Sequence, residues 1–165
     1  MKDSRTLFLD AWGKEAILSP NKEVRWRMSV YAIIQQDDRI LTVTPTWNNL
    51  LELPGGGVEI HENLTDGVIR ECLEETGYPI LITNNMPLSV WEENFYARPT
   101  DTFYHSIIFI FSAKINGVQK PEIINTADGY EIAEVSWRFL SEINANNSHR
   151  ILWRAISEIK KQHSD

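Results

Sequence analysis

The sequence is poor in cysteine and has no long apolar run. Its single cysteine, Cys72, excludes an internal disulfide, which agrees with a reducing compartment. No segment approaches the roughly eighteen uncharged apolar residues that suggest a membrane-spanning helix. The first apolar run is interrupted by Asp10, so it lacks the apolar core of a secretory signal. We therefore expect a cytoplasmic protein with no membrane partner.

Basic residues, repeats and linkers are scarce as well. The chain has 16 Lys and Arg against 23 Asp and Glu, a formal net charge of −7, and a pI of about 5.1. Such a chain does not attract a polyanion, so we expect no long nucleic acid as a partner. There is no low-complexity run, no long linker and no fixed-period repeat. Because its hydrophobic residues are spread along 165 positions, we expect a single domain over residues 1–165.

The hydrophobic pattern predicts strands on both sides of a central acidic segment. Residues 25–44 indicate two strands joined by the polar turn QQDDR, and residues 50–53 indicate a short strand. Residues 103–115 are aromatic and β-branched, and residues 131–137 alternate like a further strand. Apolar residues at helical spacing predict a C-terminal helix over residues 148–162. The order of strands, helix, strands and helix favours an α/β fold with a mixed sheet covered by helices.

The central segment joins a glycine turn to a second expected helix. The run PGGG at residues 54–57 does not easily continue a regular strand, so we expect a tight loop that a ligand can approach closely. A helix over residues 66–76 should follow this loop. Asn63 or Thr65 can cap its start, and Gly77 supplies its end.

Three glutamates crowd one face of this expected helix. Glu71, Glu74 and Glu75 stand at positions i, i+3 and i+4, so their carboxylates project together and repel one another. A solvated acidic face, screened by salt and partly offset by Arg70, is the ordinary explanation. A Mg²⁺ or Mn²⁺ site is the sharper one, since these cations take oxygen ligands and the glycine loop can add a backbone carbonyl. The cluster alone does not decide between them.

The spacing of the whole segment resembles the Nudix box, G-x5-E-x7-R-E-U-x-E-E-x-G-U, with U a bulky apolar residue. Gly56 and Glu62 are followed at the required distances by RECLEETGY at residues 70–78. The departures are mild, because Cys72 and Tyr78 fill the two apolar positions where aliphatic residues are usual. The resemblance implies a Nudix-type α/β/α sandwich around a mixed sheet, with a catalytic loop and helix.

The resemblance also implies a metal-dependent hydrolase. In the Nudix family, the glutamates of the box bind Mg²⁺ or Mn²⁺, which here implicates Glu71, Glu74 and Glu75, and the carbonyl of Gly56 often adds a ligand. The family reaction hydrolyses a nucleoside diphosphate linked to another group. Bound metal neutralises the pyrophosphate and activates a water, which a carboxylate deprotonates. Glu71 and Glu74 are therefore expected to be catalytic as well as metal-binding.

Further roles follow from the same resemblance. Arg70 is expected to support catalysis by holding neighbouring carboxylates, and Glu62 to tie the loop to the helix. Glu59, in the glycine loop, is a candidate for the outer shell of the substrate site. A glutamate outside the box often serves as a ligand or general base. Glu134 is our choice and Glu131 the second, although an outward-facing strand charge explains Glu134 equally well.

Substrate choice is less visible in the sequence. Trp47, Tyr96 and His105 are candidate substrate contacts, because aromatic faces stack on bases. For each aromatic residue a place in the core is the simpler explanation. Tyr96 resembles the downstream tyrosine of family members that cleave diadenosine polyphosphates. A nucleoside triphosphate, a dinucleoside polyphosphate or another small nucleotide is therefore the expected substrate.

Two other readings of the sequence remain open. A Nudix-fold module that binds a nucleotide without turnover would keep the same box. An enzyme that trims 5′-pyrophosphate from RNA should show a basic strip, which only Lys14, Lys22, Arg25 and Arg27 could form. Oligomeric state is open too. Many family members pair, and the segment before Arg25 could serve a homodimer interface or cover the sheet.

Overall fold

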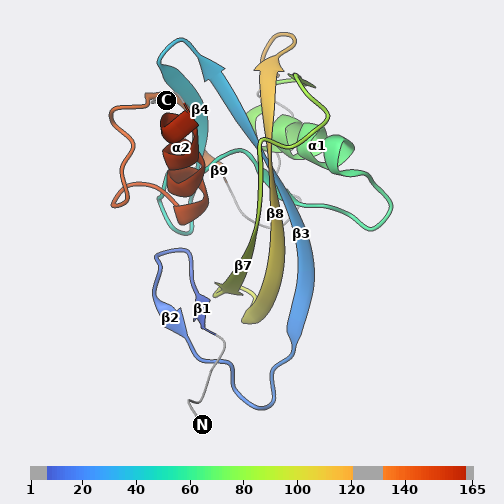
Figure 1. Cartoon of the computed structure of the whole chain (residues 1–165), viewed down its shortest axis with the longest axis vertical. Coiled ribbons are helices and arrows are strands. Elements are labelled where there is room, and N and C mark those ends of the chain that lie inside the picture. The colour runs from blue at the N-terminus through green and yellow to red at the C-terminus, as the bar shows by residue number, and fades with distance from the viewer. Residues whose placement is uncertain (1–6, 121–131, 163–165) are drawn as a thin grey trace.

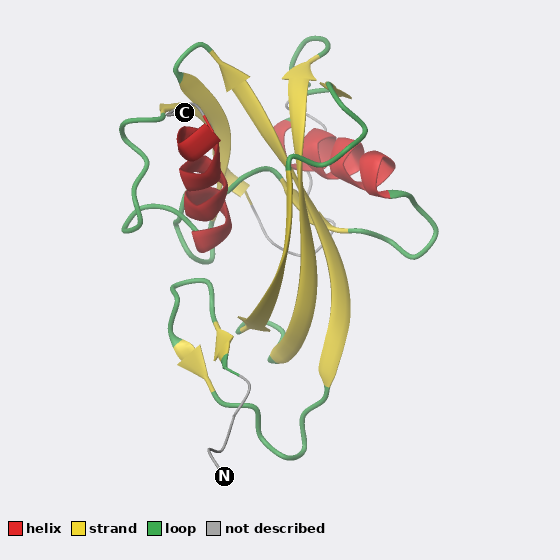
Figure 2. Cartoon of the chain, in the orientation of Figure 1, coloured by secondary structure: helices red, strands yellow, loops and turns green. Residues whose placement is uncertain are grey.

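A computed structural model of the chain describes residues 7–120 and 132–162 (Figures 1 and 2). In chain order its elements are β1 (Phe8–Leu9), β2 (Glu15–Ala16), β3 (Val24–Gln36), β4 (Arg39–Pro45), β5 (Gly55–Gly57), α1 (Leu64–Thr76), β6 (Ile80–Ile82), β7 (Ser89–Ala97), β8 (Thr102–Ile115), β9 (Ile132–Phe139) and α2 (Arg150–Gln162). Within the described part of the chain, neither helix is long and apolar enough to cross a membrane.

The strands form a mixed sheet built on a central parallel pair. The strand order is β2-β1-β7-β8-β3-β4-β9, while β5 pairs with β3 and β6 pairs with β8. Strands β3 and β8 run parallel, with Val24 opposite Phe103 and Ile34 opposite Ala113. Strand β3 also pairs antiparallel with β4, as the pattern of residues 25–44 predicts. The expected mixed sheet is therefore confirmed, and β3 lies at its centre.

The two helices cover opposite faces of this sheet. Side chains alternate along β3, so Val30 packs in a cluster with Val68 and Cys72 of α1. Ile33, which points to the other face, packs in a second cluster with α2. The residues that α2 contributes there are Ile151, Leu152, Ala155 and Ile156. This arrangement confirms the predicted α/β/α sandwich, in which both helices are held by their apolar faces.

Helix α1 begins and ends where its local signals indicate. Asn63 is the N-cap, because its side-chain oxygen accepts a hydrogen bond from the backbone N–H of Asp66 at 2.9 Å. Thr65, the alternative cap, instead donates its hydroxyl to Asn63. Gly77 adopts φ 70° and its N–H bonds to the carbonyl of Leu73, a left-handed ending that favours glycine. The helix thus starts at Leu64, two residues before the predicted start.

The glycine run differs from its prediction. Gly55–Gly57 form strand β5, which pairs antiparallel with β3, rather than a loop outside the sheet. The close approach explains why glycine is needed, since a Cβ on Gly55 would lie 2.1 Å from the carbonyl oxygen of Val30. Gly55 also has φ +143°, which L side chains rarely adopt. Residues 50–53 form only isolated bridges, at Leu51 and Glu52, instead of the expected strand.

Candidate active site

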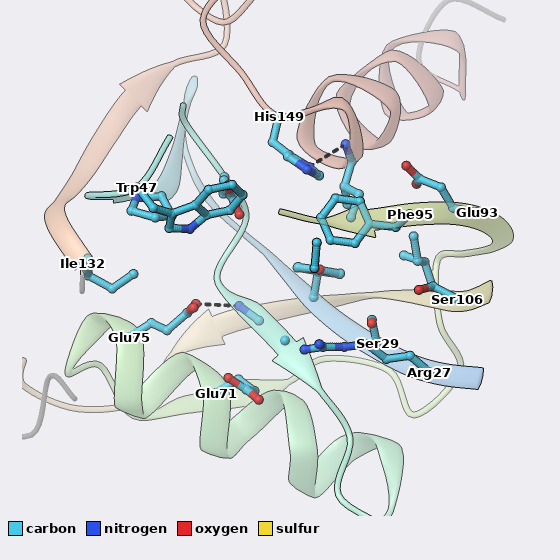
Figure 3. Close-up of a pocket in the computed structure, with 18 of the residues that line it drawn as sticks. Arg27, Ser29, Trp47, Glu71, Glu75, Glu93, Phe95, Ser106, Ile132 and His149 are labelled. Carbon is cyan, nitrogen blue, oxygen red and sulfur yellow. Dashed lines mark hydrogen bonds between the residues drawn. The ribbon is translucent and has the colours of Figure 1, made fainter. Parts of the chain in front are cut away.

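A pocket opens where β3, β5, α1, β7 and the start of α2 meet (Figure 3). We call its wall of metal-ligand candidates the acidic face, made of Gly56, Glu71, Glu74 and Glu75. We call its opposite wall the aromatic chamber, made of Tyr31, Trp47, Phe95 and His149. Glu52, Glu93 and Arg27 also line the pocket. One cavity therefore joins the acidic residues of the box to an aromatic wall.

Arg70 organises the acidic face. Its Nη2 donates to Glu62 at 2.6 Å, and its Nη1 donates to Glu71 at 3.0 Å and to Glu74 at 3.2 Å. Nη2 also donates to the carbonyl of Gly57, which ties the helix to β5. The hydrogen bond from Arg70 lowers the pKa of Glu62, and the same bond raises the pKa of Arg70. The repulsion within the glutamate cluster is thus offset by one guanidinium.

The glycine strand lies directly against the glutamates of α1. A Cβ on Gly56 would lie between 2.8 and 2.9 Å from three atoms of the Glu71 carboxylate. The backbone N–H of Gly55 donates to Glu75 at 2.8 Å (Figure 3). Glu71 is nearly buried, with 7% of its surface exposed. Strand β5 therefore presents its backbone to the carboxylates at contact distance.

The residues of the acidic face fit a hard divalent cation by donor type. Carboxylates and a glycine carbonyl are the oxygen ligands that Mg²⁺ and Mn²⁺ prefer. Among the described residues, no group of three or more His, Cys, Asp or Glu side chains is yet gathered as a metal site. In this arrangement Glu74 accepts from Arg70, and Glu75 accepts from Gly55. Each carboxylate has two oxygens with several acceptor positions, so Glu74 and Glu75 can bind an ion while they accept these hydrogen bonds.

His149 contributes an imidazole ring to the aromatic chamber. It stands at the N-cap position of α2, where its Nδ1 accepts a hydrogen bond from the N–H of Ile151 at 3.3 Å. Its ring lies 6.2 Å from that of Phe95, edge to face at 75°. Burial, with a smaller contribution from the charge of Arg150, lowers the pKa of His149 to about 3. The imidazole is therefore neutral at physiological pH.

Sequence reasoning missed His149 and two carboxylates that line the pocket, Glu52 and Glu93. Burial raises the pKa of Glu52 to about 7, although a hydrogen bond from Asn48 opposes that rise. Burial also raises the pKa of Glu93, which forms an ion pair with Arg150. The position of Glu52 beside the glycine run was a usable signal. Glu93 and His149 gave none, because their elements meet the pocket only in the folded chain.

The predicted substrate contacts lie at different places in the structure. Trp47 lines the pocket, as part of the aromatic chamber. Glu59 lines an adjacent groove, together with Trp26 and Tyr104. Arg27 lines both the groove and the pocket, with its guanidinium 5.3 Å from the ring centre of Tyr104. Glu59 thus lies beside the acidic face rather than within it.

Tyr96 and His105 are not among the residues that line the pocket. The hydroxyl of Tyr96 donates to Asp101 at 2.9 Å. The Nδ1 of His105 lies 2.7 Å from the side-chain oxygen of Asn94, and its ring contacts that of Trp26. Asp101 lies in the turn after β7 and Asn94 lies within β7, and the roles of Tyr96 and His105 as substrate contacts stay predictions.

Glu134 also lies outside the pocket lining. It stands on β9, with about half of its side chain exposed, and both of its oxygens accept from Arg138. Residue 132 of the same strand does reach the pocket. The second choice, Glu131, falls outside the described residues. The role of Glu134 as a general base therefore stays a prediction.

Comparison with known proteins identifies the family. The family model of the NUDIX domain matches residues 25–157. The chain belongs to the NUDIX family. The predicted resemblance is thereby confirmed, and the matched range holds both the acidic face and the aromatic chamber.

Relatives and solved structures agree with the NUDIX assignment. Nudix hydrolase 17, mitochondrial, from Arabidopsis thaliana is 26% identical over 85 residues, which are 52% of this chain and 44% of that protein. The human m7GpppN-mRNA hydrolase NUDT17 is 27% identical over 124 residues, 67% of this chain and 37% of that protein. The chain thus spans less than half the length of either. A solved NUDIX hydrolase from Nitrosomonas europaea superposes with a TM-score of 0.66 at 24% identity, covering 85% of this chain and 90% of its own.

An N-terminal hairpin precedes the NUDIX match and reaches the pocket wall. Its turn places Trp12 against Trp47, with ring centres 5.6 Å apart and planes at 83°. Asp10, which is fully buried, accepts from the N–H groups of Trp12 and Lys14 and forms an ion pair with Arg98. Burial raises the pKa of Asp10, but the bonds from Arg98 and the backbone lower it overall. A built turn therefore holds Trp12 in place.

Proposed function

We propose that this chain hydrolyses a pyrophosphate bond in a small nucleotide, such as a nucleoside triphosphate or a dinucleoside polyphosphate, with Mg²⁺ or Mn²⁺ bound at the acidic face. The observation that carries this proposal is the shared cavity. It brings the glutamates of the NUDIX box and a wall of aromatic rings to the two sides of one pocket. A nucleotide needs both walls, because its diphosphate binds through the metal at the acidic face and its planar base stacks on the aromatic rings.

The acidic face would hold the ion through Glu71, Glu74, Glu75 and the carbonyl of Gly56. A bound divalent ion supplies charge neutralisation at the pyrophosphate and lowers the pKa of a coordinated water. Arg70 fixes Glu71 and Glu74 relative to each other, since it donates to both. The backbone of β5 limits the position of the Glu71 carboxylate, because Gly56 has no side chain and the carboxylate lies against it.

Arg27 supports phosphate binding in the same pocket. Its guanidinium lies over the ring of Tyr104 and against Gly57, where a Cβ would lie 2.9 Å from Nη2. Arginine binds phosphate oxygens with planar, charged N–H groups. A guanidinium beside the acidic face can therefore orient phosphate oxygens that are not bound by the ion.

The general base is either Glu134 or one of the carboxylates that line the pocket. Glu134 would have to leave Arg138 to reach the pocket. The carboxylates that already line the pocket need no such movement. We expect the Glu134→Gln variant to retain activity if a pocket carboxylate takes the proton, and to lose it if Glu134 does. The pH profile of kcat for this variant decides between them.

The structure gives little support to RNA as the substrate. Of the four basic residues that could form a patch, Arg27 lines the pocket itself. Lys22 forms an ion pair with Asp101, and the chain carries a net charge of −7. The relative NUDT17 is named as an mRNA cap hydrolase, so capped and triphosphorylated RNA belong in the substrate panel. A homodimer and a cytoplasmic location stay predictions.

Substitution of the box glutamates tests the proposal. We expect Glu74→Gln and Glu75→Gln to lower kcat on the order of 10³-fold, because each removes a charged oxygen ligand while keeping the shape of the side chain. Cleavage is followed by chromatography of the nucleotide products with Mg²⁺ or Mn²⁺ on nucleoside triphosphates, dinucleoside polyphosphates, nucleotide sugars and RNA.

Circular dichroism and thermal melts should show that both variants remain folded. Full activity in both would remove these residues from the mechanism. If the wild-type protein binds nucleotides and cleaves none of them, the chain is a binding module instead.

A further inference from the structure

His149 contributes to the aromatic chamber an imidazole that the proposed hydrolysis does not use. Its surface is 6% exposed, and it lines the pocket at the start of α2. Figure 3 shows it across the pocket from the acidic face, with Trp47 and Phe95 at its two sides. A buried imidazole at this place demands an account of its hydrogen bonds.

The backbone and the Nδ1 atom of His149 are fully engaged. Its N–H donates to the carbonyl of Leu51 at 2.8 Å, and its carbonyl accepts from Trp153 at 3.1 Å. Its Nδ1 accepts from the N–H of Ile151 at 3.3 Å. The first contact ties His149 to the segment before β5, and the other two tie it to α2. The ring is therefore held in one orientation and cannot turn without releasing the helix cap.

The remaining nitrogen, Nε2, has to be a hydrogen-bond donor. In a neutral imidazole one nitrogen accepts and the other carries the proton. Because Nδ1 accepts from Ile151, the proton is on Nε2. No described residue accepts a hydrogen bond from this Nε2–H. Because His149 lines the pocket, an acceptor atom of a ligand can accept a hydrogen bond from this N–H.

The surroundings of His149 suit a flat ring. Trp47 and Phe95 line the pocket beside it, and Tyr31 is a further aromatic residue of the lining. Phe95 is itself held, since Arg150 lies over its ring at 5.5 Å and forms an ion pair with Glu93. Fixed aromatic walls stack on nucleobases, and a donor at their edge can select the base that faces it.

We propose that His149 reads the base of the substrate, donating its Nε2–H to a carbonyl oxygen or ring nitrogen of a heteroaromatic base placed between Trp47 and Phe95. This inference rests on the proposed function and names the residue that makes the nucleoside end of that site specific. Binding to the acidic face does not depend on it.

Two substitutions separate base reading from helix capping. His149→Asn keeps an acceptor for the N–H of Ile151, since Asn is a favoured N-cap, but its side chain is too short to place a donor at Nε2. His149→Gln can place an amide N–H near the position of Nε2 and is a poor cap. We expect His149→Asn to melt within a few degrees of wild type and to raise KM about tenfold for the preferred nucleoside triphosphate, with kcat within about twofold. His149→Gln should recover part of that loss in KM.

A base-free substrate supplies the control. ATP, GTP, CTP and UTP are compared with tripolyphosphate, which carries the phosphates and no base. Calorimetry with α,β-methylene nucleotides in EDTA gives Kd independently of turnover, and it should show the same tenfold weakening for His149→Asn. Unchanged KM and Kd for every nucleotide, or an equal loss with tripolyphosphate, would overturn the role of His149. If neither the wild type nor the variants cleave any of these substrates, the proposed function fails, while Kd still decides the role of His149.

Discussion

The acidic face and the aromatic chamber differ in how the chain builds them. The acidic face comes from one continuous segment, residues 56–75, in which a strand and a helix follow each other directly. The aromatic chamber takes one residue each from β3, the segment after β4, β7 and the start of α2. The proposed metal ligands are therefore close together in the sequence, while the proposed base-binding wall is formed by distant segments that meet only in the fold.

The two walls also differ in how their charges are balanced. Arg70 offsets the carboxylates of the acidic face and lowers the pKa of Glu62. Glu52, which also lines the pocket, forms no ion pair with a described residue, and burial raises its pKa although Asn48 donates a hydrogen bond to it. We expect changes at the acidic face to lower kcat, and changes around the chamber to act on KM or stability.

Gly56→Ala, a change at the acidic face, should have the largest effect, and it should act on kcat. The added methyl group would lie between 2.8 and 2.9 Å from the Glu71 carboxylate, so that side chain has to move. A displacement of about 1 Å in a catalytic group can lower the rate about 100-fold, and we expect a fall in kcat of that order. Steady-state kinetics with Mg²⁺ measure it.

Gly67→Ala is the matched control for Gly56→Ala. Its Cβ would meet the end of the Glu62 side chain at 3.1 Å, and alanine favours the helix by up to about 1 kcal/mol. Gly67→Ala should therefore keep kcat within severalfold. Equal losses in the two variants would mean that any crowding of this segment, rather than the position of Glu71, reduces the rate.

Trp12→Ala should have a smaller effect, and on KM. Its ring supports Trp47 edge to face, so its removal loosens one wall of the chamber without touching the acidic face. An edge-to-face aromatic pair contributes about 0.5 to 1.5 kcal/mol, which corresponds to a two- to tenfold rise in KM. Trp12→Phe should recover most of it.

Trp153→Ala, a change on the outer part of α2, is the control for Trp12→Ala. Near-ultraviolet circular dichroism should change in Trp12→Ala, because two contacting indoles are separated. A fall in kcat at constant KM would contradict the positioning role of Trp12.

Glu52→Gln should have the smallest effect on the kinetics and should act on stability. The folded-state pKa of about 7 lies above the ordinary 4.5, so ionisation of Glu52 is unfavourable in the folded protein. Its favourable contribution is complete below about pH 4.5 and is lost as the pH rises through 7. The neutral Gln avoids this loss, so the variant should gain roughly 2 kcal/mol at most, relative to wild type, between pH 5 and 8.

Urea unfolding in EDTA at pH 5 and pH 8 measures this difference. Glu134→Gln, at an exposed carboxylate, is the control. A stability difference that stays constant over this pH range would show that Glu52 does not titrate there.

Much of the acidic face could be predicted from the sequence. Asn63, the spacing of the glutamates and Gly77 act within a few residues of one another, so their pattern indicates a capped helix with one acidic face. The strand β5 was not predicted, because the glycines pair with β3 only where Val30 comes within contact distance. Local propensity does not record such a long-range contact.

The aromatic chamber could be predicted only in part. Trp47 was identified, but Phe95 was one of several aromatic residues in its segment, and nothing near His149 distinguishes it from an ordinary N-cap. Strand β7 was not predicted, since its alternation is interrupted by charged residues. The ion pair between Glu93 and Arg150, which positions this wall, joins residues far apart in the sequence.

The parallel pairing of β3 with β8 sets an order of events during synthesis. The partners Val24 and Phe103 are separated by nearly half of the 165-residue chain, so the central pair cannot form until the ribosome has released β8. Hairpin β3–β4 and helix α1 are synthesised before β8, so until then they lack the packing contacts that the later strands provide. The residues of the acidic face are therefore synthesised early, and the pocket is complete only after the later strands have joined the sheet.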